Sequence, residues 1–307
     1  MTPARILVTG ASGFVGGHLG AALAARFPTT DVISGEADLR DHQAVAQMVA
    51  HTRPDACVHL AAISTVSQAA ADQDVAWAVN LHGTLALARA LQAQVPACRL
   101  IFPSSAEAYG ASFRAGVALD EAAPLAPLTL YGVTKASADL ALGMMAGGGL
   151  DVVRVRAFNH TGPGQSDSFV VSAFARQLAA ISLGQQAPEM LVGNLDSARD
   201  FLDVRDVCAA YAAAIAVERV PSGCILNIAS GTARRIADVL AELRALAGVA
   251  VSVRTDPARL RPSDIPTASG NASAARALLG WSPRIPWRTT LSDLFEDWRM
   301  RLQGKSD

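Results

Sequence analysis

The sequence predicts an α/β protein built on a doubly wound, mostly parallel sheet, with a smaller C-terminal α/β domain. Short apolar runs at residues 5–8, 31–34, 55–62 and 99–105 are each followed by a segment with helical periodicity. A further run at 150–156 closes the series. Most of these runs are apolar throughout rather than alternating, which is typical of strands covered on both faces. Strands that alternate with helices predict parallel pairing, because each helix carries the chain back across the sheet.

The regular alternation loosens after residue 157, where we place a domain boundary. Residues 1–157 are assigned to the first domain and 158–307 mainly to the second, and we expect the chain to return to the first domain within 200–230. Hydrophobic residues make up 51% of the 307 residues and charged residues 17%, so the chain can bury a large core. In the second half the patterns predict a strand at 224–228 and helices at 169–183, 235–247 and 289–301.

Composition excludes several classes of protein. The longest apolar stretch, 207–217, has 11 residues, whereas a membrane-spanning helix needs about 20. The net charge is −1 and no basic block occurs, which argues against a nucleic-acid binder. The N-terminus has no signal-peptide pattern. The four cysteines are scattered through apolar runs, so we expect buried thiols in a reducing cytoplasm and no disulfide or metal site.

A glycine-rich turn follows the first predicted strand, in the stretch Thr9-Gly10-Ala-Ser-Gly13-Phe-Val-Gly16. Gly10 would permit the tight turn, Gly13 would let the backbone approach a pyrophosphate, and Gly16 would allow close helix–strand packing. A strand before the turn and a helix after it favour dinucleotide binding over a plain strand-to-helix turn. The predicted cofactor contacts are Gly10, Ser12, Gly13, Phe14, Val15, Gly16, Asp38, Leu39, Leu60, Ala61, Ala62, Asn80, Tyr131 and Lys135.

The segment after the second predicted strand leaves the choice between NAD(H) and NADP(H) open. An acidic residue at the end of this strand is typical of NAD sites, and a nearby arginine of NADP sites. Ser34 is neither, and Glu36 and Arg40 flank it ambiguously. Asp38 could bind the adenine amino group, or it could cap the helix that begins near His42.

Tyr131 and Lys135 are four residues apart in a segment predicted to be a helix, so they share one face. Lys135 is one of only two lysines in the chain, the other being Lys305. An ammonium near a phenol would stabilise the phenolate and lower the pKa of the tyrosine. The alternative is an ordinary solvated helix face that carries a lysine.

Together, these motifs resemble a known family. TGASGFVG, DLRD, HLAA, PSSAEAYG, YGVTK and AFNHTGPGQ occur in the order found in extended short-chain dehydrogenase/reductases, of the NAD-dependent epimerase/dehydratase type, that act on nucleotide sugars. The resemblance implies a Rossmann-like first domain, a nicotinamide cofactor and a C-terminal substrate domain. It implies Ser105, Tyr131 and Lys135 as catalytic residues, with Ser104 a weaker candidate and Tyr109 and Tyr211 as packing residues. It also implies a homodimer formed through helices 80–94 and 131–145.

The second half most resembles GDP-6-deoxy-4-keto-D-mannose reductases, which make GDP-D-rhamnose, through FVVSAFARQ, VGNLDSARDFLDVRDV and LRPSDIPT. Arginines matching Arg199 and Arg261 contact the diphosphate in that family, and a guanidinium fork suits phosphate oxygens. Surface or interdomain ion pairs are the alternative for both. Asn159 matches a residue that holds the sugar or its phosphate. The resemblance implies substrate contacts from Ser105, Glu107, Tyr131, Asn159, Phe169, Val170, Arg199, Arg261 and Asp264.

In this interpretation Tyr131 donates a proton to the C4 oxygen of a keto-sugar and Ser105 stabilises the charge that develops there. The alternatives are a GDP-mannose 4,6-dehydratase, in which Glu107 would be the elimination base, and another nucleotide-sugar 4-reductase or epimerase. A dinucleotide-sensing protein without chemistry is the alternative from another class. The C4 configuration of the product, rhamnose or 6-deoxytalose, stays open, and the guanine base rests on the resemblance alone.

Overall fold

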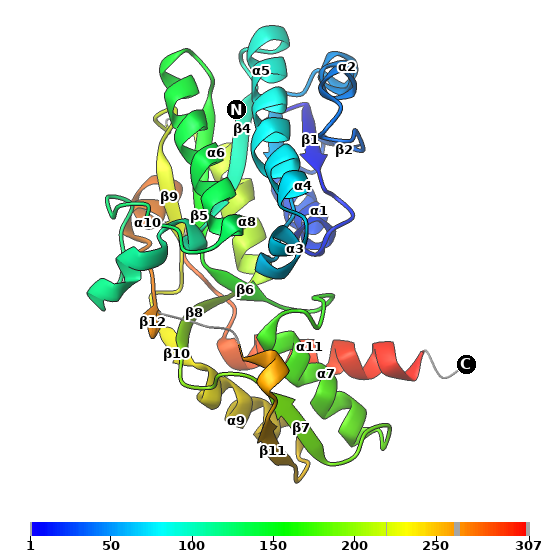
Figure 1. Ribbon diagram of the computed structural model, residues 1–307. Coiled ribbons are helices and arrows are strands. Elements are labelled where there is room, and N and C mark those ends of the chain that lie inside the picture. Colours follow the sequence, from blue (N-terminus) through cyan, green and yellow to red (C-terminus); the bar gives the residue numbers. More distant parts are fainter. Residues whose placement is uncertain (1, 219, 261–264, 305–307) are drawn as a thin grey trace.

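A computed structural model describes residues 2–218, 220–260 and 265–304. Its centre is a parallel sheet of six strands in the order β2-β1-β3-β4-β5-β9 (Figure 1). The order reverses direction at β1, so the sheet is doubly wound and the predicted fold class is confirmed. The strands are β1 (Arg5–Thr9), β2 (Asp31–Gly35), β3 (Ala56–His59), β4 (Arg99–Ser105), β5 (Val152–Ala157) and β9 (Ile225–Ile228).

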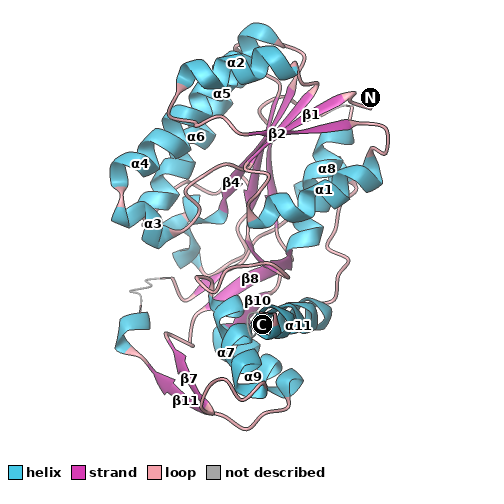
Figure 2. Cartoon of the chain, turned by 90° about the vertical axis from the view of Figure 1, so that its right-hand side faces the viewer, coloured by secondary structure: helices cyan, strands magenta, loops and turns pink. Residues whose placement is uncertain are grey.

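Helices cover both faces of this sheet (Figure 2). In β1, Ile6 and Val8 point into one core and Leu7 into the other, because successive side chains of a strand alternate between faces. Both faces are buried, which explains why the strands lack polar alternation. The helices of one face are α1 (Phe14–Arg26) and α8 (Val204–Ala216), and those of the other are α2 (His42–Thr52), α5 (Thr84–Gln94) and α6 (Leu130–Gly147).

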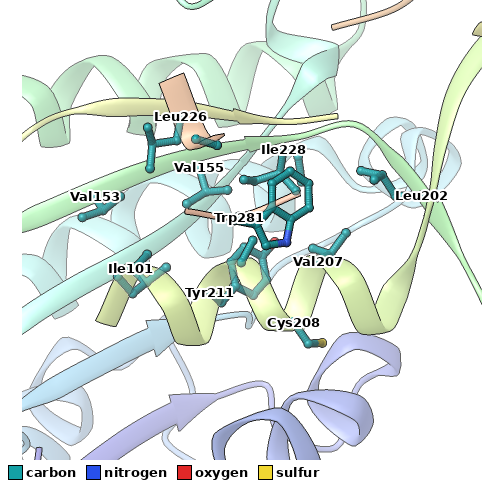
Figure 3. Close-up of a cluster of buried hydrophobic side chains, with 14 of the residues drawn as sticks. Ile101, Val153, Val155, Leu202, Val207, Cys208, Tyr211, Leu226, Ile228 and Trp281 are labelled. Atoms are coloured by element: carbon teal, nitrogen blue, oxygen red, sulfur yellow. The ribbon is translucent and has the colours of Figure 1, made fainter. Parts of the chain in front are cut away.

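Residues 204–228 supply α8 and the edge strand β9 to this sheet layer. Figure 3 shows Tyr211 of α8 beneath side chains of β5 and β9, with Trp281 from the C-terminal region beside them. The Trp281 indole is buried, and its Nε1 donates to the carbonyl of Asp206 at 2.9 Å. The segment between α10 and α11, which contains Trp281, is therefore packed into the same core as the first strand.

A second layer lies at the carboxyl ends of the main strands (Figure 1). Here β8 (Ala198–Asp203) pairs with β10 (Ala233–Arg235), β12 (Thr267–Ala268) and β6 (Asn159–Thr161), while β7 (Glu189–Val192) pairs with β11 (Ser252–Thr255). Its own core combines Met190, Val192 and Phe201 of β7 and β8 with aliphatic and aromatic side chains of three helices. These are α7 (Val170–Ser182), α9 (Ile236–Ala247) and α11 (Trp287–Gln303), and a shorter α10 (Ser273–Leu279) packs on β9.

Two segments differ from the predicted secondary structure. The segment from 158 to 164, predicted as a loop, contains the short strand β6. This strand forms because it pairs with β8, and the local sequence alone does not indicate it. The helix predicted to begin at 80 instead runs from α4 (Gln73–Trp77) through a π-helical turn (Ala78–Gly83) into α5. A short helix α3 (Val66–Ala71) precedes it.

Within the described residues, no helix is long and apolar enough to cross a bilayer. Those residues also contain no group of three or more histidine, cysteine or acidic side chains that could hold a metal ion.

Candidate active site

The carboxyl ends of β1 and β3 lie side by side where the strand order reverses. The chain leaves β1 toward β2 on one side, and β3 leads toward β4 on the other. Open α/β sheets bind ligands at such a switch point. The glycine turn after β1 and residues 60–62 after β3 were predicted as cofactor contacts from separate motifs, and the fold brings them to this one edge.

Gly10 lies where the two loops touch. Its φ is +70°, in the left-handed region that favours glycine, and an added Cβ would lie 2.6 Å from the backbone nitrogen of Ala61. Gly13 N donates to Gly10 O at 3.1 Å and closes the turn. Helix α1 begins at Phe14 with no acidic residue in its first turn, so its amide groups are suited to an anion. This cradle fits the pyrophosphate of a dinucleotide.

Gly16 has a different role from the one predicted. Its Cβ would collide with the backbone of Ala11 in the glycine turn, not with a strand. The missing side chain therefore lets the first turn of α1 fold back onto the glycine turn itself. Ser12 and Gly13 at the tip of the turn are exposed, and Phe14 and Val15 are half-buried.

Asp38 does not cap α2, which was the alternative to adenine binding, because Asp41 caps this helix by accepting from Gln43 N and Ala44 N. Asp38 is exposed and pairs with Arg40 at 2.6 Å, and these hydrogen bonds lower the Asp38 pKa to about 2. Leu39 between them is buried and packs where Gly83 of the π-helical turn has no side chain. Asp38 and Arg40 are thus held at the edge of the candidate cofactor site.

Ser105 and Tyr131 come together at the end of β4. Ser105 is the last residue of the strand, and its Oγ accepts from Glu107 N at 3.1 Å. Tyr131 lies in the first turn of α6, whose start is fixed by Thr129 Oγ1 accepting from Gly132 N at 3.0 Å. The Ser105 hydroxyl lies close enough to the Tyr131 phenol to lower the Tyr131 pKa, against the larger effect of burial. Two hydroxyl groups therefore meet at the edge of the sheet that carries the glycine turn.

The predicted effect of Lys135 on Tyr131 is not present in the structure. Burial raises the Tyr131 pKa to about 12, against a lowering by the Ser105 hydroxyl, and Glu107 raises it further. Lys135 is buried with its Nζ 4.7 Å from the centre of the Phe102 ring, and burial lowers its pKa to about 8. The phenol is thus protonated at neutral pH and suited to donate a proton.

Glu107 and Arg199 belong to different layers and influence each other electrostatically. Desolvation raises the Glu107 pKa and Arg199 partly offsets that rise, while desolvation lowers the Arg199 pKa and Glu107 opposes it. Arg199 Nη1 also donates to the carbonyls of Ala198 and Ile265 at 2.8 and 3.1 Å. The charge interaction between layers that we kept as an alternative for Arg199 is therefore present.

The other predicted substrate residues line the second layer. Asn159 and Val170 are exposed and Phe169 is half-buried. Arg261 and Asp264 lie outside the described residues. A polar cavity of about 150 Å³ opens beside the start of α7, where Arg176 Nε lies 3.3 Å from Asp167 Oδ2. The cavity is lined by Asp167, Ser168, Ala173, Arg176, Gln177 and Arg259.

The chain is similar to known proteins over most of its length. A family model described as GDP-mannose 4,6 dehydratase matches residues 29–294. The chain belongs to this family. It is 34% identical to GDP-6-deoxy-D-mannose reductase of Pseudomonas aeruginosa over 302 residues, covering 97% of this chain and 98% of that protein. It is 28% identical to a UDP-glucose 4-epimerase of Streptomyces lividans, covering 82% and 78%.

Solved structures of related proteins have the same fold as this chain. The structure of RMD from Pseudomonas aeruginosa complexed with NADPH superposes with a TM-score of 0.90 at 32% identity, over 97% of this chain and 99% of that one. A Thermus thermophilus UDP-glucose 4-epimerase complexed with NAD gives 0.84 at 26%, over 96% and 99%. The predicted resemblance to extended short-chain dehydrogenase/reductases is confirmed, and these relatives bind the type of cofactor predicted.

Sequence reasoning missed a chain of buried polar side chains beneath the site. It contains Thr9, His59, Thr84 and Thr134, with Asn80 among them. Their polar character inside apolar runs was the available signal. Asn80 was predicted to contact the cofactor, but its amide is buried and bonded to the protein.

The remaining tyrosines of the chain are both buried, as expected of packing residues. Tyr109 donates to Asn227 Oδ1 at 2.7 Å and accepts from Arg156 at 3.1 Å, and Tyr211 is packed in the core of Figure 3. Ser104 Oγ is buried and has no hydrogen-bond partner in the described part of the chain.

Proposed function

We propose that this protein reduces the C4 keto group of GDP-4-keto-6-deoxy-D-mannose to give GDP-D-rhamnose, with NADPH or NADH as reductant. The observation that carries the proposal is the position of Ser105, at the end of β4, beside a protonated Tyr131 in the first turn of α6, at the edge of the sheet that carries the glycine turn. Full-length similarity to a GDP-6-deoxy-D-mannose reductase supports the substrate class.

The cofactor site in this proposal is the cradle between the two loops. The Gly10 turn and the amides at the start of α1 would bind the pyrophosphate, and residues 60–62 would lie against the rest of the dinucleotide. Arg40 would face the adenosine ribose, where an arginine accommodates a 2′-phosphate. When bound, a reduced nicotinamide would supply the hydride.

The protein's own chemistry is proton delivery and charge stabilisation. Tyr131 would give its phenolic proton to the C4 oxygen as general acid, and its raised pKa keeps that proton available. Ser105 would hydrogen-bond the same oxygen as charge develops on it. Lys135, adjacent on the helix and buried, would bind the nicotinamide ribose hydroxyls.

Substrate binding would use the second layer. Phe169 and Val170 lie at the start of α7, near the polar cavity with Asp167 and Arg176, and Asn159 begins β6. We propose Arg199 and Arg261 as diphosphate contacts, and Glu107 and Asp264 as sugar or ribose contacts. In this division residues 1–157, with α8 and β9, form the cofactor domain and 158–307 mainly the substrate domain.

The second candidate is GDP-mannose 4,6-dehydratase activity, favoured by the position of Glu107. This carboxyl lies near enough to Tyr131 to raise its pKa, and its own raised pKa would suit a group that exchanges protons. The deciding experiment supplies purified protein with GDP-mannose plus NADP⁺, or with GDP-4-keto-6-deoxy-D-mannose plus NADPH or NADH. The reductase is supported if the cofactor is oxidised and GDP-D-rhamnose forms with GDP-4-keto-6-deoxy-D-mannose, and no reaction occurs with GDP-mannose. Formation of the keto-sugar from GDP-mannose would refute it.

We propose a cytoplasmic homodimer for the working enzyme. Leu140 and Met144 on α6 are 60% and 73% exposed, an unusual amount of apolar surface on the helix that carries Tyr131. Pairing of α5 and α6 with their copies would cover both side chains. We expect Leu140→Arg with Met144→Arg to convert dimer to monomer in light scattering, and a wild-type monomer would contradict this assembly.

A further inference from the structure

The Asn80 side chain connects two segments that both border the candidate active site. Its Oδ1 accepts from Ile63 N at 2.8 Å, and its Nδ2 donates to Ile63 O at 3.0 Å. The same Nδ2 donates to Thr134 Oγ1 at 3.1 Å, across 54 positions of sequence. One buried amide therefore holds the loop after β3 to helix α6.

Thr134 passes this connection on to the proposed proton donor. Its hydroxyl accepts from Asn80 and donates to the backbone carbonyl of Tyr131 at 2.9 Å. That carbonyl is in the first turn of α6. The position of the Tyr131 backbone is thus coupled to the loop that borders the cofactor cradle, through two side chains that are 2% and 0% exposed.

The π-helical turn explains how Asn80 reaches both partners. Ala78–Gly83 is a widened turn between α4 and α5, and such turns occur frequently at functional sites. Gly83 closes it, and a Cβ there would lie 2.6 Å from Leu39 Cβ, so the turn packs directly on the segment after β2. In a regular α-helix the Asn80 side chain would point in another direction. The π-helical turn therefore agrees with a requirement that Asn80 reach both Ile63 and Thr134.

His59 extends the connection to the glycine turn. The hydroxyl of Thr84 donates to Asn80 O at 2.8 Å, so it must accept from His59 Nε2 at 3.0 Å. His59 Nδ1 is then an acceptor for Thr9 Oγ1 at 2.7 Å. Thr9 Oγ1 in turn accepts from Ala61 N at 3.3 Å. The ring is neutral in this arrangement, and the chain of bonds runs from the end of β1 to α6.

We propose that Asn80 and Thr134 are positioning residues, which fix the distance between the cofactor-binding loop after β3 and the Tyr131 phenol. The amide of Asn80 acts through Ile63 and Thr134 rather than by touching the cofactor. This inference rests on the proposed reductase function for its kinetic part. A misplacement of about 1 Å between reacting groups can lower a rate about 100-fold, so loosening this link is expected to reduce kcat more than binding.

Thr134→Val tests the link with little change of volume, and Thr134→Ser is its matched control because it keeps the hydroxyl. We expect Thr134→Val to lower kcat about tenfold or more, to change KM for NAD(P)H less than threefold, and to raise the primary isotope effect with 4-deuterated cofactor. Thr134→Ser should recover most of kcat. Equal losses in the two variants, or an unchanged kcat in Thr134→Val, would overturn the proposal.

A second measurement separates this proposal from the reductase assignment. Hydrogen exchange of the folded protein without substrate should increase in Thr134→Val at both 60–66 and 128–136, and Thr134→Ser should match the wild type. An increase limited to 128–136 would overturn the coupling. If the wild type reduces no keto-sugar, the reductase assignment fails, while the exchange pattern still decides whether the two segments are coupled.

Discussion

Replacing Tyr131 by phenylalanine removes the proposed proton donor and little else. The ring is half-buried in the first turn of α6, and its hydroxyl lies near Ser105. Even a full hydrogen bond of this hydroxyl would contribute only about 0.5–1.5 kcal/mol of stability, and no methylene is removed, so no cavity forms. We therefore expect Tyr131→Phe to fold and to lose only a few degrees of melting temperature.

The effect on catalysis should be much larger. Removing one donor aimed at a developing oxyanion costs about 2.7–4 kcal/mol, which corresponds to a loss of about 100–1,000-fold in kcat. Tyr131 also supplies the proton itself, so we expect the upper part of this range or beyond. The affinity for NAD(P)H should stay close to that of the wild type, because the glycine cradle is untouched.

The assay follows oxidation of NAD(P)H by absorbance with GDP-4-keto-6-deoxy-D-mannose, with cofactor affinity measured separately by fluorescence. Ser105→Ala is the matched comparison, since it removes the other hydroxyl of the pair but keeps the proton donor, and we expect a smaller loss. A Tyr131→Phe variant with near-normal kcat would refute the assignment of the proton donor.

Three further predictions concern other parts of the site. Burial lowers the Lys135 pKa to about 8, whereas the Tyr131 pKa is about 12. Turnover should therefore fall as the pH rises through about 8, because Lys135 loses its charge while Tyr131 keeps its proton. A pH profile that stays flat to pH 10 would contradict this. Gly10→Ala should cost about 1–3 kcal/mol of unfolding free energy and weaken cofactor binding, whereas Gly17→Ala, with open space around it, should not destabilise. Arg40→Ala should raise KM for NADPH and leave KM for NADH nearly unchanged. Equal changes in the two KM values would show that Arg40 does not contact the 2′-phosphate.

Local sequence patterns predicted the parts of the site that depend on one segment. Gly10 needs a positive φ and close approach to the loop after β3, and only glycine allows both, so the turn was visible in the sequence. The helical spacing of Tyr131 and Lys135 was equally local. The direction of the Lys135 side chain depends on the Phe102 ring, which belongs to another element, and so the predicted effect on the tyrosine pKa was wrong.

Contacts between distant segments leave little trace in a single sequence. The bond of Asn80 to Thr134 requires a π-helical turn whose local sequence resembles any alanine-rich helix. His59 stands in an apolar strand, and its two threonine partners become visible only when β1, β3 and α5 are packed. The strand β6 likewise forms because β8 lies beside it.

The electrostatics of the tyrosine favour reduction over the alternatives. A dehydratase or epimerase first needs the phenol as a base that removes a proton from a sugar hydroxyl, and a depressed pKa would help that step. Here burial and the nearby Glu107 both raise the Tyr131 pKa, and Lys135 is held against Phe102. A phenol in that environment holds its proton at neutral pH and can give it to the alkoxide that would form when a hydride reaches a ketone. The protein's own charges therefore suit the direction in which a C4 ketone becomes an alcohol.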